Sequence, residues 1–222
     1  MKFVRYLPLL FVIIFVSVAI VFAVTIKKSG ETIITPSPST TPLLKENIST
    51  NFSLKNAPSE SLRGTISSMS GEISWQSRVA TEAAVITTPL EIQQGEDLIT
   101  GENGTLKLSF PNACDINLSE NTEVDIIQTL PLSIVFSQIT GTAEYTKVGS
   151  SPVTIRTSYL LSEITGNVII ERDTDNQIVT VTIRPGEVIF AYNDSKFVSH
   201  VVNAKAGQTY TFNYGTRKGV LK

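Results

Sequence analysis

Residues 104–110 read Gly-Thr-Leu-Lys-Leu-Ser-Phe, so large apolar side chains alternate with the polar Lys107 and Ser109. Successive side chains of a β-strand point to opposite faces, and this alternation therefore predicts a strand with one buried face. The same period of two recurs in residues 153–156 and 179–183. The segment is typical of the whole C-terminal part of the chain, and it predicts a sheet-based fold.

Turn-forming residues separate these apolar runs at short intervals. They occupy residues 94–96, 101–104, Gly141, 166–167, 173–176, 185–186 and 206–207. Short strands with turn signals at this spacing are typical of an all-β architecture. Residues 80–84 are too few for a stable helix, and β-branched residues dominate elsewhere. We therefore expect one all-β domain, built as a jelly-roll-like or β-solenoid-like stack of short strands.

The N-terminal part of the chain has a different character. Residues 6–26 contain no charged side chain and consist almost entirely of apolar residues. A helix of this length covers roughly 30 Å, the thickness of the hydrocarbon core of a bilayer. Residues 1–5 form a short basic stub before it. The pattern predicts one transmembrane helix; a cleavable signal peptide is the alternative, although its apolar region is usually shorter.

Residues 27–61 are poor in aromatic residues and rich in Ser, Thr, Pro and Asn. Such a composition cannot bury enough apolar surface to fold, and its prolines favour an extended spacer. A spacer of this kind is suited to holding a domain away from a membrane. We therefore expect a single-pass protein of the cell membrane with its C-terminal domain outside the cytoplasm, although basic residues flank the apolar segment on both sides.

The composition of residues 62–222 limits the possible partners. Their number fits one domain with its own core. The whole chain has 18 basic and 20 acidic residues, and no run of Lys and Arg marks the folded part. No nucleic-acid-binding surface is therefore expected. The single cysteine, Cys114, allows no intramolecular disulfide and is expected to be a buried strand residue.

The order of the strand and turn segments resembles that of the FecR domain family. The segments that carry the resemblance lie between about residues 62 and 212: residues 71–73, 94–101, 104–110, 118–122, 141–145, 153–157, 166–170, 181–188 and 206–210. Each segment alone occurs in many β-proteins, and it is the order of the segments that is typical of the FecR domain family. The resemblance implies an all-β domain of residues 62–212, followed by a tail of residues 213–222, that acts as a binding, sensing or signalling module of the cell envelope.

Two departures from the family pattern narrow this expectation. Where the family often has Asp-Gly-Ser at a hairpin tip, residues 111–115 read Pro-Asn-Ala-Cys-Asp, and Asn112 is expected to take a left-handed conformation there. The family's regulatory members resemble iron-uptake signal transducers with a cytoplasmic domain that engages a sigma factor. A stub of five residues cannot form such a domain. The resemblance therefore supports an envelope module without that regulatory mechanism.

The sequence offers few candidates for catalysis or metal binding. His200 is the only histidine and lies in an apolar run, where a residue of a strand face is expected. Two carboxylate pairs, Glu96 with Asp97 and Asp173 with Asp175, stand in turn-like contexts, where short polar side chains bond their own backbone. Calcium at residues 173–176 is conceivable from the alternating oxygen ligands, but the glycine of an EF-hand loop is absent. We predict no catalytic residue, no cofactor and no metal.

The sequence thus favours a non-enzymatic module that binds an unknown envelope protein or glycan through a sheet face or a strand edge. Phe110, Phe190 and Phe212 are expected in the core, whereas Trp75 is either a core residue or part of a binding surface. Two alternatives stay open. One is a pilin-like structural protein assembled through its apolar helix, and the other is an anchored hydrolase that uses His200 or a carboxylate pair.

Overall fold

The computed structural model describes Ala57 and residues 60–222. The predicted transmembrane segment, residues 6–26, and nearly all of the predicted linker, residues 27–61, lie outside the described residues. Within the described part, no helix has the length and apolarity needed to cross a bilayer.

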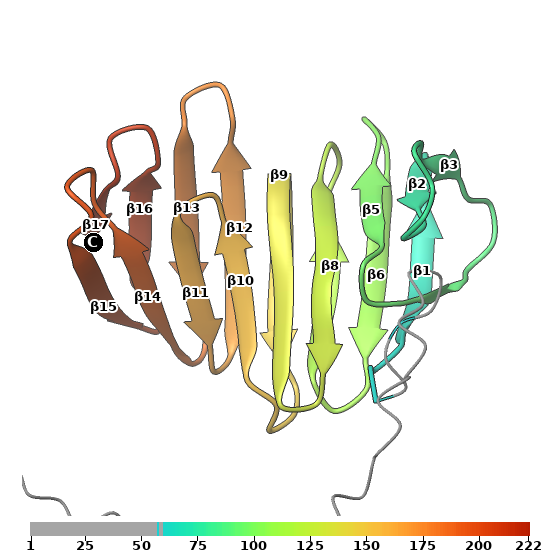
Figure 1. The fold of residues 1–222 in the computed structure, drawn as a ribbon, viewed down its shortest axis with the longest axis horizontal. Helices are drawn as coiled ribbons and strands as arrows, with labels where there is room; N and C mark the ends of the chain where they lie inside the picture. The colour runs from blue at the N-terminus through green and yellow to red at the C-terminus, as the bar shows by residue number, and fades with distance from the viewer. Residues whose placement is uncertain (1–56, 58–59) are drawn as a thin grey trace, which may run out of the picture. The chain divides into compact units, whose positions relative to one another are not determined.

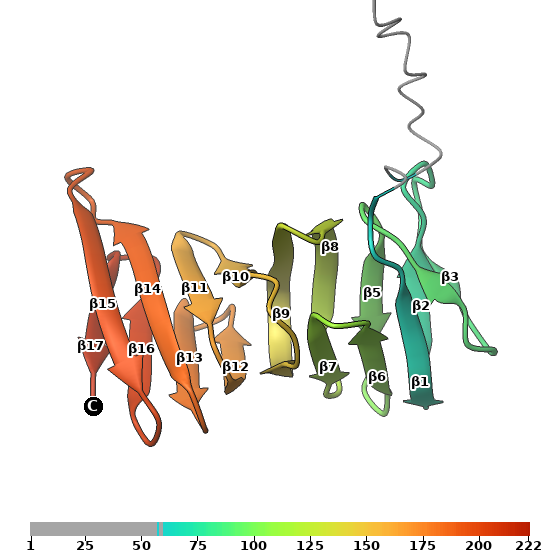
Figure 2. The same ribbon diagram turned by 90° about the horizontal axis from the view of Figure 1, so that it is seen from below.

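The described residues form an all-β domain of two layers, as the sequence predicted (Figures 1 and 2). The first layer contains, in spatial order, β4 (Glu91–Ile92), β1 (Gly64–Ser70), β6 (Thr105–Phe110), β7 (Cys114–Leu118), β9 (Ser133–Lys147), β12 (Asn167–Asp173), β13 (Ile178–Ile183), β16 (Thr209–Asn213) and β17 (Lys218–Leu221). The second layer contains β3 (Ala84–Val85), β2 (Ile73–Gln76), β5 (Asp97–Thr100), β8 (Glu123–Leu130), β9, β10 (Val153–Thr157), β11 (Leu160–Ile164), β14 (Glu187–Asn193) and β15 (Ser199–Lys205).

The C-terminal half is a stack of antiparallel hairpins that alternate between the layers. The hairpins β10–β11 and β14–β15 lie in the second layer, and β12–β13 and β16–β17 lie in the first. Among the described strands, β9 and β10 form the one parallel pair. The expected stack of short strands is therefore built from antiparallel hairpins and not from the parallel coils of a β-solenoid.

Strand β9 joins the two layers. Residues 133–140 of β9 pair with β8 and β10 in the second layer, and residues 141–147 pair with β7 and β12 in the first. The crossing occurs at Gly141, which has φ +79°, a value that favours glycine. The sequence pattern had placed Gly141 in a turn; it lies inside the longest strand instead. The amide of the buried Gln138 donates to the carbonyls of Gly141 and Ile170, at 2.8 Å and 3.0 Å, and so satisfies backbone acceptors at the crossing.

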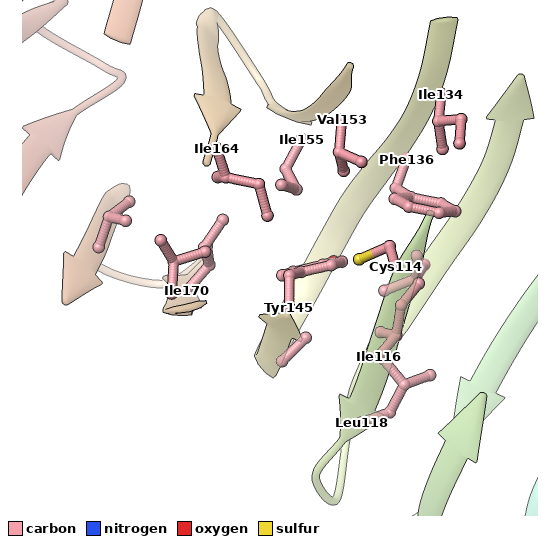
Figure 3. Packing of buried hydrophobic residues seen from close by; sticks show 14 of the residues in the cluster. Cys114, Ile116, Leu118, Ile134, Phe136, Tyr145, Val153, Ile155, Ile164 and Ile170 are labelled. Carbon is pink, nitrogen blue, oxygen red and sulfur yellow. The ribbon is translucent and has the colours of Figure 1, made fainter. Parts of the chain in front are cut away.

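The core lies between the layers and consists of the inward residues of the predicted period-two strands. Leu106, Leu108 and Phe110 of β6 are buried, as are the inward residues of β10 and β13. Phe110 packs on Phe136 with ring centroids 5.3 Å apart, and Phe136 packs on Tyr145 at 6.1 Å. Figure 3 shows Phe136 and Tyr145 among the buried apolar side chains between the layers. A second aromatic group joins Phe190 to Tyr210 at 4.2 Å. The predicted core positions of Phe110, Phe190 and Phe212 are confirmed.

Cys114 is fully buried in β7 beside this core (Figure 3), as predicted. Burial, with Asp115 nearby, raises the pKa of its thiol to about 12. The residue therefore acts as a small hydrophobe and is protonated at neutral pH. Asn112, in the turn before it, has φ +56°, which confirms the expected left-handed conformation.

The domain extends beyond the C-terminal boundary that the family resemblance implied. Residues 213–222 were expected to be a tail, but β17 pairs with β16 from Tyr210↔Leu221 to Asn213↔Lys218. Thr209 and Lys222 exchange backbone hydrogen bonds of 2.9 Å and 3.0 Å. Residues 218–221 are too few to show a clear alternation, which explains why the sequence did not predict this strand.

Candidate binding surface at the C-terminal hairpin tips

The tips of the four C-terminal hairpins meet on one surface, here called the tip surface: residues 158–159, 174–177, 194–198 and 214–217. An open hollow of about 550 Å³ is lined by residues of three of them, together with Arg156. A second hollow, of about 570 Å³, lies between the tips 194–198 and 214–217. Segments from residue 158 to residue 217 of the sequence thus form one exposed region.

Each tip contains one residue other than glycine in the left-handed region. These residues are Ser158, Gln177, Phe197 and Arg217, with φ between +51° and +62°. Left-handed φ is strained for residues with a side chain, most of all for bulky ones. Glycine would fit these turns without strain. Side chains are therefore held on this surface at some cost to the fold, which is a feature of binding sites.

Asp194 fixes the tip that carries Phe197. Its Oδ1 accepts hydrogen bonds from the backbone N–H groups of Lys196 and Val198, at 2.8 Å and 2.9 Å. The backbone N–H of Phe197 donates to the Asp194 carbonyl at 3.0 Å. Phe197 nevertheless remains 78% exposed, and Val198 is 53% exposed. The loop thus presents two apolar side chains to solvent on a backbone held by these bonds, so little backbone entropy is lost when a partner covers them.

Arg217 connects the neighbouring tips. Its guanidinium lies 3.9 Å from the centroid of the Tyr159 ring and 5.8 Å from that of Phe197. Both distances fit cation–π contacts. Neither Arg217 nor Arg156 forms a salt bridge with a carboxylate of the described residues. The N–H groups of two guanidinium groups therefore border the hollow, and no salt bridge of the described residues engages them.

His200, the one histidine, lies next to the tip surface in β15. Its Nε2 is 3.1 Å from Asp194 Oδ2, and its ring stacks on Tyr192 with centroids 5.0 Å apart. This hydrogen bond is the largest cause of the lowered pKa of Asp194. The sequence had not linked His200 to Asp194. The contact ties the tip to β15. His200 lies on a strand, as predicted.

The first sequence-predicted carboxylate pair is separated by the fold. Glu96 is buried and its Oε2 accepts hydrogen bonds from Trp75 Nε1 at 3.0 Å and from the backbone N–H of Gln93 at 2.8 Å. Trp75 is partly buried and packs against the core. Glu96 and Trp75 thus hold one another in the domain. Asp97, the next residue, begins β5 and is half-buried.

Asp97 instead lies opposite Asp125 of β8. Partial burial and the nearby charges of Asp97 and Glu123 raise the pKa of Asp125 to about 6. Partial burial also raises the pKa of Asp97. Cross-strand neighbours of like charge destabilise a sheet, and a raised pKa is the expected response. Sequence reasoning missed this pair because the two residues lie on strands whose pairing was unknown.

We expect Asp125→Asn to stabilise the protein at pH 7.5 but not at pH 4.5. A carboxyl group whose pKa is raised by folding contributes stability below its unfolded pKa, and this contribution is lost as pH rises through about 6. The substitution removes a partly buried charge together with its repulsion by Asp97 and Glu123, with a gain of about 1 kcal/mol after allowance for solvent screening. Thermal unfolding at both pH values measures the difference. An equal gain at both would show that the buried charge of Asp125 is not the cause.

The second carboxylate pair forms a turn. Asp173 accepts hydrogen bonds from the backbone N–H groups of Asp175 and Asn176, at 3.0 Å and 2.9 Å, and from Asn176 Nδ2 at 2.6 Å. These bonds lower its pKa. The carboxylate is thus occupied by its own loop, the β12–β13 tip. In the described part of the chain, no three His, Cys, Asp or Glu side chains are grouped as metal ligands.

The fold also gathers basic residues that looked scattered in the sequence. Lys196, Arg217 and Lys218 line the same hollow between the tips 194–198 and 214–217. Lys218 begins β17, which the sequence did not predict. Lys196 belongs to a hairpin of the second layer, and Arg217 and Lys218 belong to one of the first, so the sequence did not show that they lie together.

Comparisons with known proteins give little further information. No protein-family model matches the chain, and no curated protein matches it significantly. Two crystal structures, at 2.50 Å and 1.65 Å resolution, of a "putative anti-sigma factor" from Parabacteroides distasonis resemble it with 13% sequence identity and a TM-score of 0.49. Each match covers 57% of this chain and 58% of the other, so the chain spans less than two thirds of that protein. A likeness at this level carries no argument about function.

Proposed function

We propose that the chain is a membrane-anchored, FecR-like binding module outside the cytoplasm, without catalytic activity, that binds an envelope partner through its tip surface. The apolar segment 6–26, the Pro-rich residues after it and the order of the strand segments support the anchor and the family. The exposed, strained Phe197 supports the location of the binding surface. This residue is the single observation on which the assignment of the surface depends.

A protein is a better partner for this surface than a glycan. Sugars stack on open aromatic faces, whereas Arg217 already covers the Tyr159 ring. The other exposed side chains beside the tips are aliphatic: Leu161 is 45% exposed and Val201 is 68% exposed. Both flank Ala191 on the outer face of the second layer. Aliphatic side chains gain most when another apolar surface covers them, as in protein interfaces.

Phe197→Gly is expected to weaken partner binding about 30-fold or more while leaving the domain folded. Loss of a central aromatic residue typically costs 2 kcal/mol or more of binding free energy. Glycine relieves the strain at φ +62° but makes the unfolded chain more flexible, so the unfolding free energy should stay within about 1 kcal/mol. The partner is first isolated from envelope extracts with the full-length chain in detergent, and its affinity is then measured for both proteins.

Leu132→Ser is the matched control for this experiment. Leu132 is 88% exposed in the turn between β8 and β9, so it is as exposed as Phe197 but outside the tip surface. We expect its substitution to leave the affinity unchanged. Equal losses for the two variants would assign binding to general surface hydrophobicity. A hydrolytic activity that is lost in His200→Gln, with the fold intact, would support the anchored hydrolase instead.

The proposed topology is tested by protease added to spheroplasts. If residues 6–26 span the membrane with the amino end inside, protease should remove the β-domain and leave a small membrane-bound fragment. Lysed spheroplasts provide the control for protease access. Protection of the whole chain in intact spheroplasts would place the domain on the cytoplasmic side. Release of the intact β-domain from the membrane before protease is added would favour the cleavable signal peptide.

A further inference from the structure

The two ends of the sandwich differ in how their sheet edges are protected. At the end near the start of the domain, the edge strands β3 and β4 have two residues each. At the opposite end, β15 has seven residues and β17 has four. Very short edge strands offer few free backbone groups to another chain. Of these four outermost strands, β15 is the longest.

Strand β15 lacks the usual features that prevent pairing at an edge. Within the described residues it pairs only with β14. Its sequence, Ser-His-Val-Val-Asn-Ala-Lys, contains no proline and no glycine, and its one charged residue, Lys205, stands at its end. Val201, near its middle, is 68% exposed. Such an edge can accept hydrogen bonds from, and donate them to, an added strand.

The last part of the chain, which contains β15, has a net charge opposite to that of the remaining domain. Residues 194–222 contain five basic residues and one acidic residue, a net charge of +4. Residues 60–193 contain seven basic and seventeen acidic residues, a net charge of −10. Lys196, Arg217 and Lys218 line the hollow between β15 and β17, and none of them forms a salt bridge with a carboxylate of the described residues. The open edge thus lies in a locally basic environment.

We propose that β15 is a docking edge for an extended acidic segment of a partner protein, which adds a tenth strand to the second layer. This inference rests on the proposed function and names the chemistry of the partner. Backbone hydrogen bonds to β15 provide the pairing, apolar side chains of the segment cover Val201, and its acidic side chains meet Lys196, Arg217 and Lys218.

A second copy of the chain is a poorer occupant of this edge. An antiparallel pairing of two β15 strands about Val202 would place Ser199 of each copy opposite Lys205 of the other. Lys196, three residues before Ser199, would then approach the Lys205 of the other copy. Like charges close together in an interface disfavour association. An acidic segment meets no such repulsion.

The test uses the full-length chain in detergent micelles and a synthetic probe, acetyl-Asp-Thr-Val-Thr-Val-Thr-Val-Thr-Asp-amide. We expect binding with a dissociation constant below about 1 mM, the weak range of single short contacts. Replacing both Asp residues of the peptide with Lys should weaken binding at least 10-fold. Two further peptides carry N-methyl groups at alternate residues, in one or the other phase. In an added strand, alternate N–H groups point toward β15 and the others point away from it. The peptide whose N-methyl groups point toward β15 should bind at least 10-fold more weakly, and the other peptide should keep its affinity.

Hydrogen exchange locates the added strand. With the acidic peptide bound, backbone amides of residues 199–205 should exchange at least 10-fold more slowly, and those of residues 218–221 should not change. Equal binding of both N-methylated peptides, protection away from β15, or formation of dimers through β15 would overturn the proposal. If the isolated envelope partner binds in a way that depends on Phe197 but the acidic peptide does not bind, the docking edge is wrong and the proposed function stands. If no partner depends on Phe197, the proposed function itself fails.

Discussion

Val181→Asp is expected to destabilise the domain by about 4 kcal/mol or more. Val181 has no exposed surface and lies in β13, opposite Ile170 of β12 and Tyr210 of β16. The new carboxyl group would be buried without a hydrogen-bond partner, and the packing of the valine side chain would be lost. A domain of this size is stable by only about 5 to 15 kcal/mol. Its melting temperature should therefore fall by about 10 °C or more.

Thr182→Asp is the matched control. Thr182 is the next residue of the same strand, but it is exposed on the outer face of the first layer. It lies opposite Ile169 and Thr209, so a carboxylate there meets no like charge across the strands. We expect a change within about 0.5 kcal/mol. If the two variants melt alike, Val181 does not face the core and the register of β13 is wrong.

These assignments rest on the part of the fold that the sequence predicts well. Alternation in residues 104–110, 153–156 and 179–183 identified the buried face of each strand without any knowledge of its partners. The reason is physical: apolar and polar residues must alternate along a strand that has one buried and one solvent-exposed face, wherever it lies in a sheet. The same signal placed Phe110 and Phe212 in the core. Local periodicity thus determined which side chains are buried.

The features that depend on strand pairing could not be predicted in this way. Asp97 and Asp125 are 28 positions apart and become neighbours only because β5 pairs with β8. Likewise, the tip surface exists because four hairpins place their turns together, and Phe197 reads in the sequence as part of an apolar run. The positive φ of Phe197 has no sequence signal, since glycine or asparagine is the usual residue there. Candidate sites formed between strands therefore remained hidden.

The crossing of β9 between the layers is the clearest case of a structural role that the sequence pattern did not reveal. A glycine among polar residues is a turn signal, and Gly141 was assigned to a turn for that reason. In the structure, the residue lets one strand serve two layers. The space that a side chain at position 141 would need is already occupied. A Cβ atom built on Gly141 would lie 2.4 Å from the Asn121 carbonyl oxygen and 2.4 Å from Thr122 Oγ1.

Gly141→Ala is consequently expected to cost about 3 to 5 kcal/mol of unfolding free energy. About 1 kcal/mol comes from placing a side chain at φ +79°. The remainder comes from displacing Thr122, whose Oγ1 accepts a hydrogen bond from the backbone N–H of Thr142 at 2.9 Å. Thr122 is fully buried, so groups that lose their partners there are left without water. Urea denaturation of the full-length chain in detergent measures the loss.

Gly207→Ala separates the backbone strain from the packing. Gly207 has φ +84°, close to that of Gly141, but a Cβ atom there would meet nothing within 4 Å. Its substitution should therefore cost only the strain, about 1 kcal/mol. The difference between the two variants, about 2 to 4 kcal/mol, measures how tightly the layers close around β9. Equal costs would mean that the crossing tolerates a side chain and that the two layers are joined more loosely at Gly141 than the contacts with Asn121 and Thr122 require.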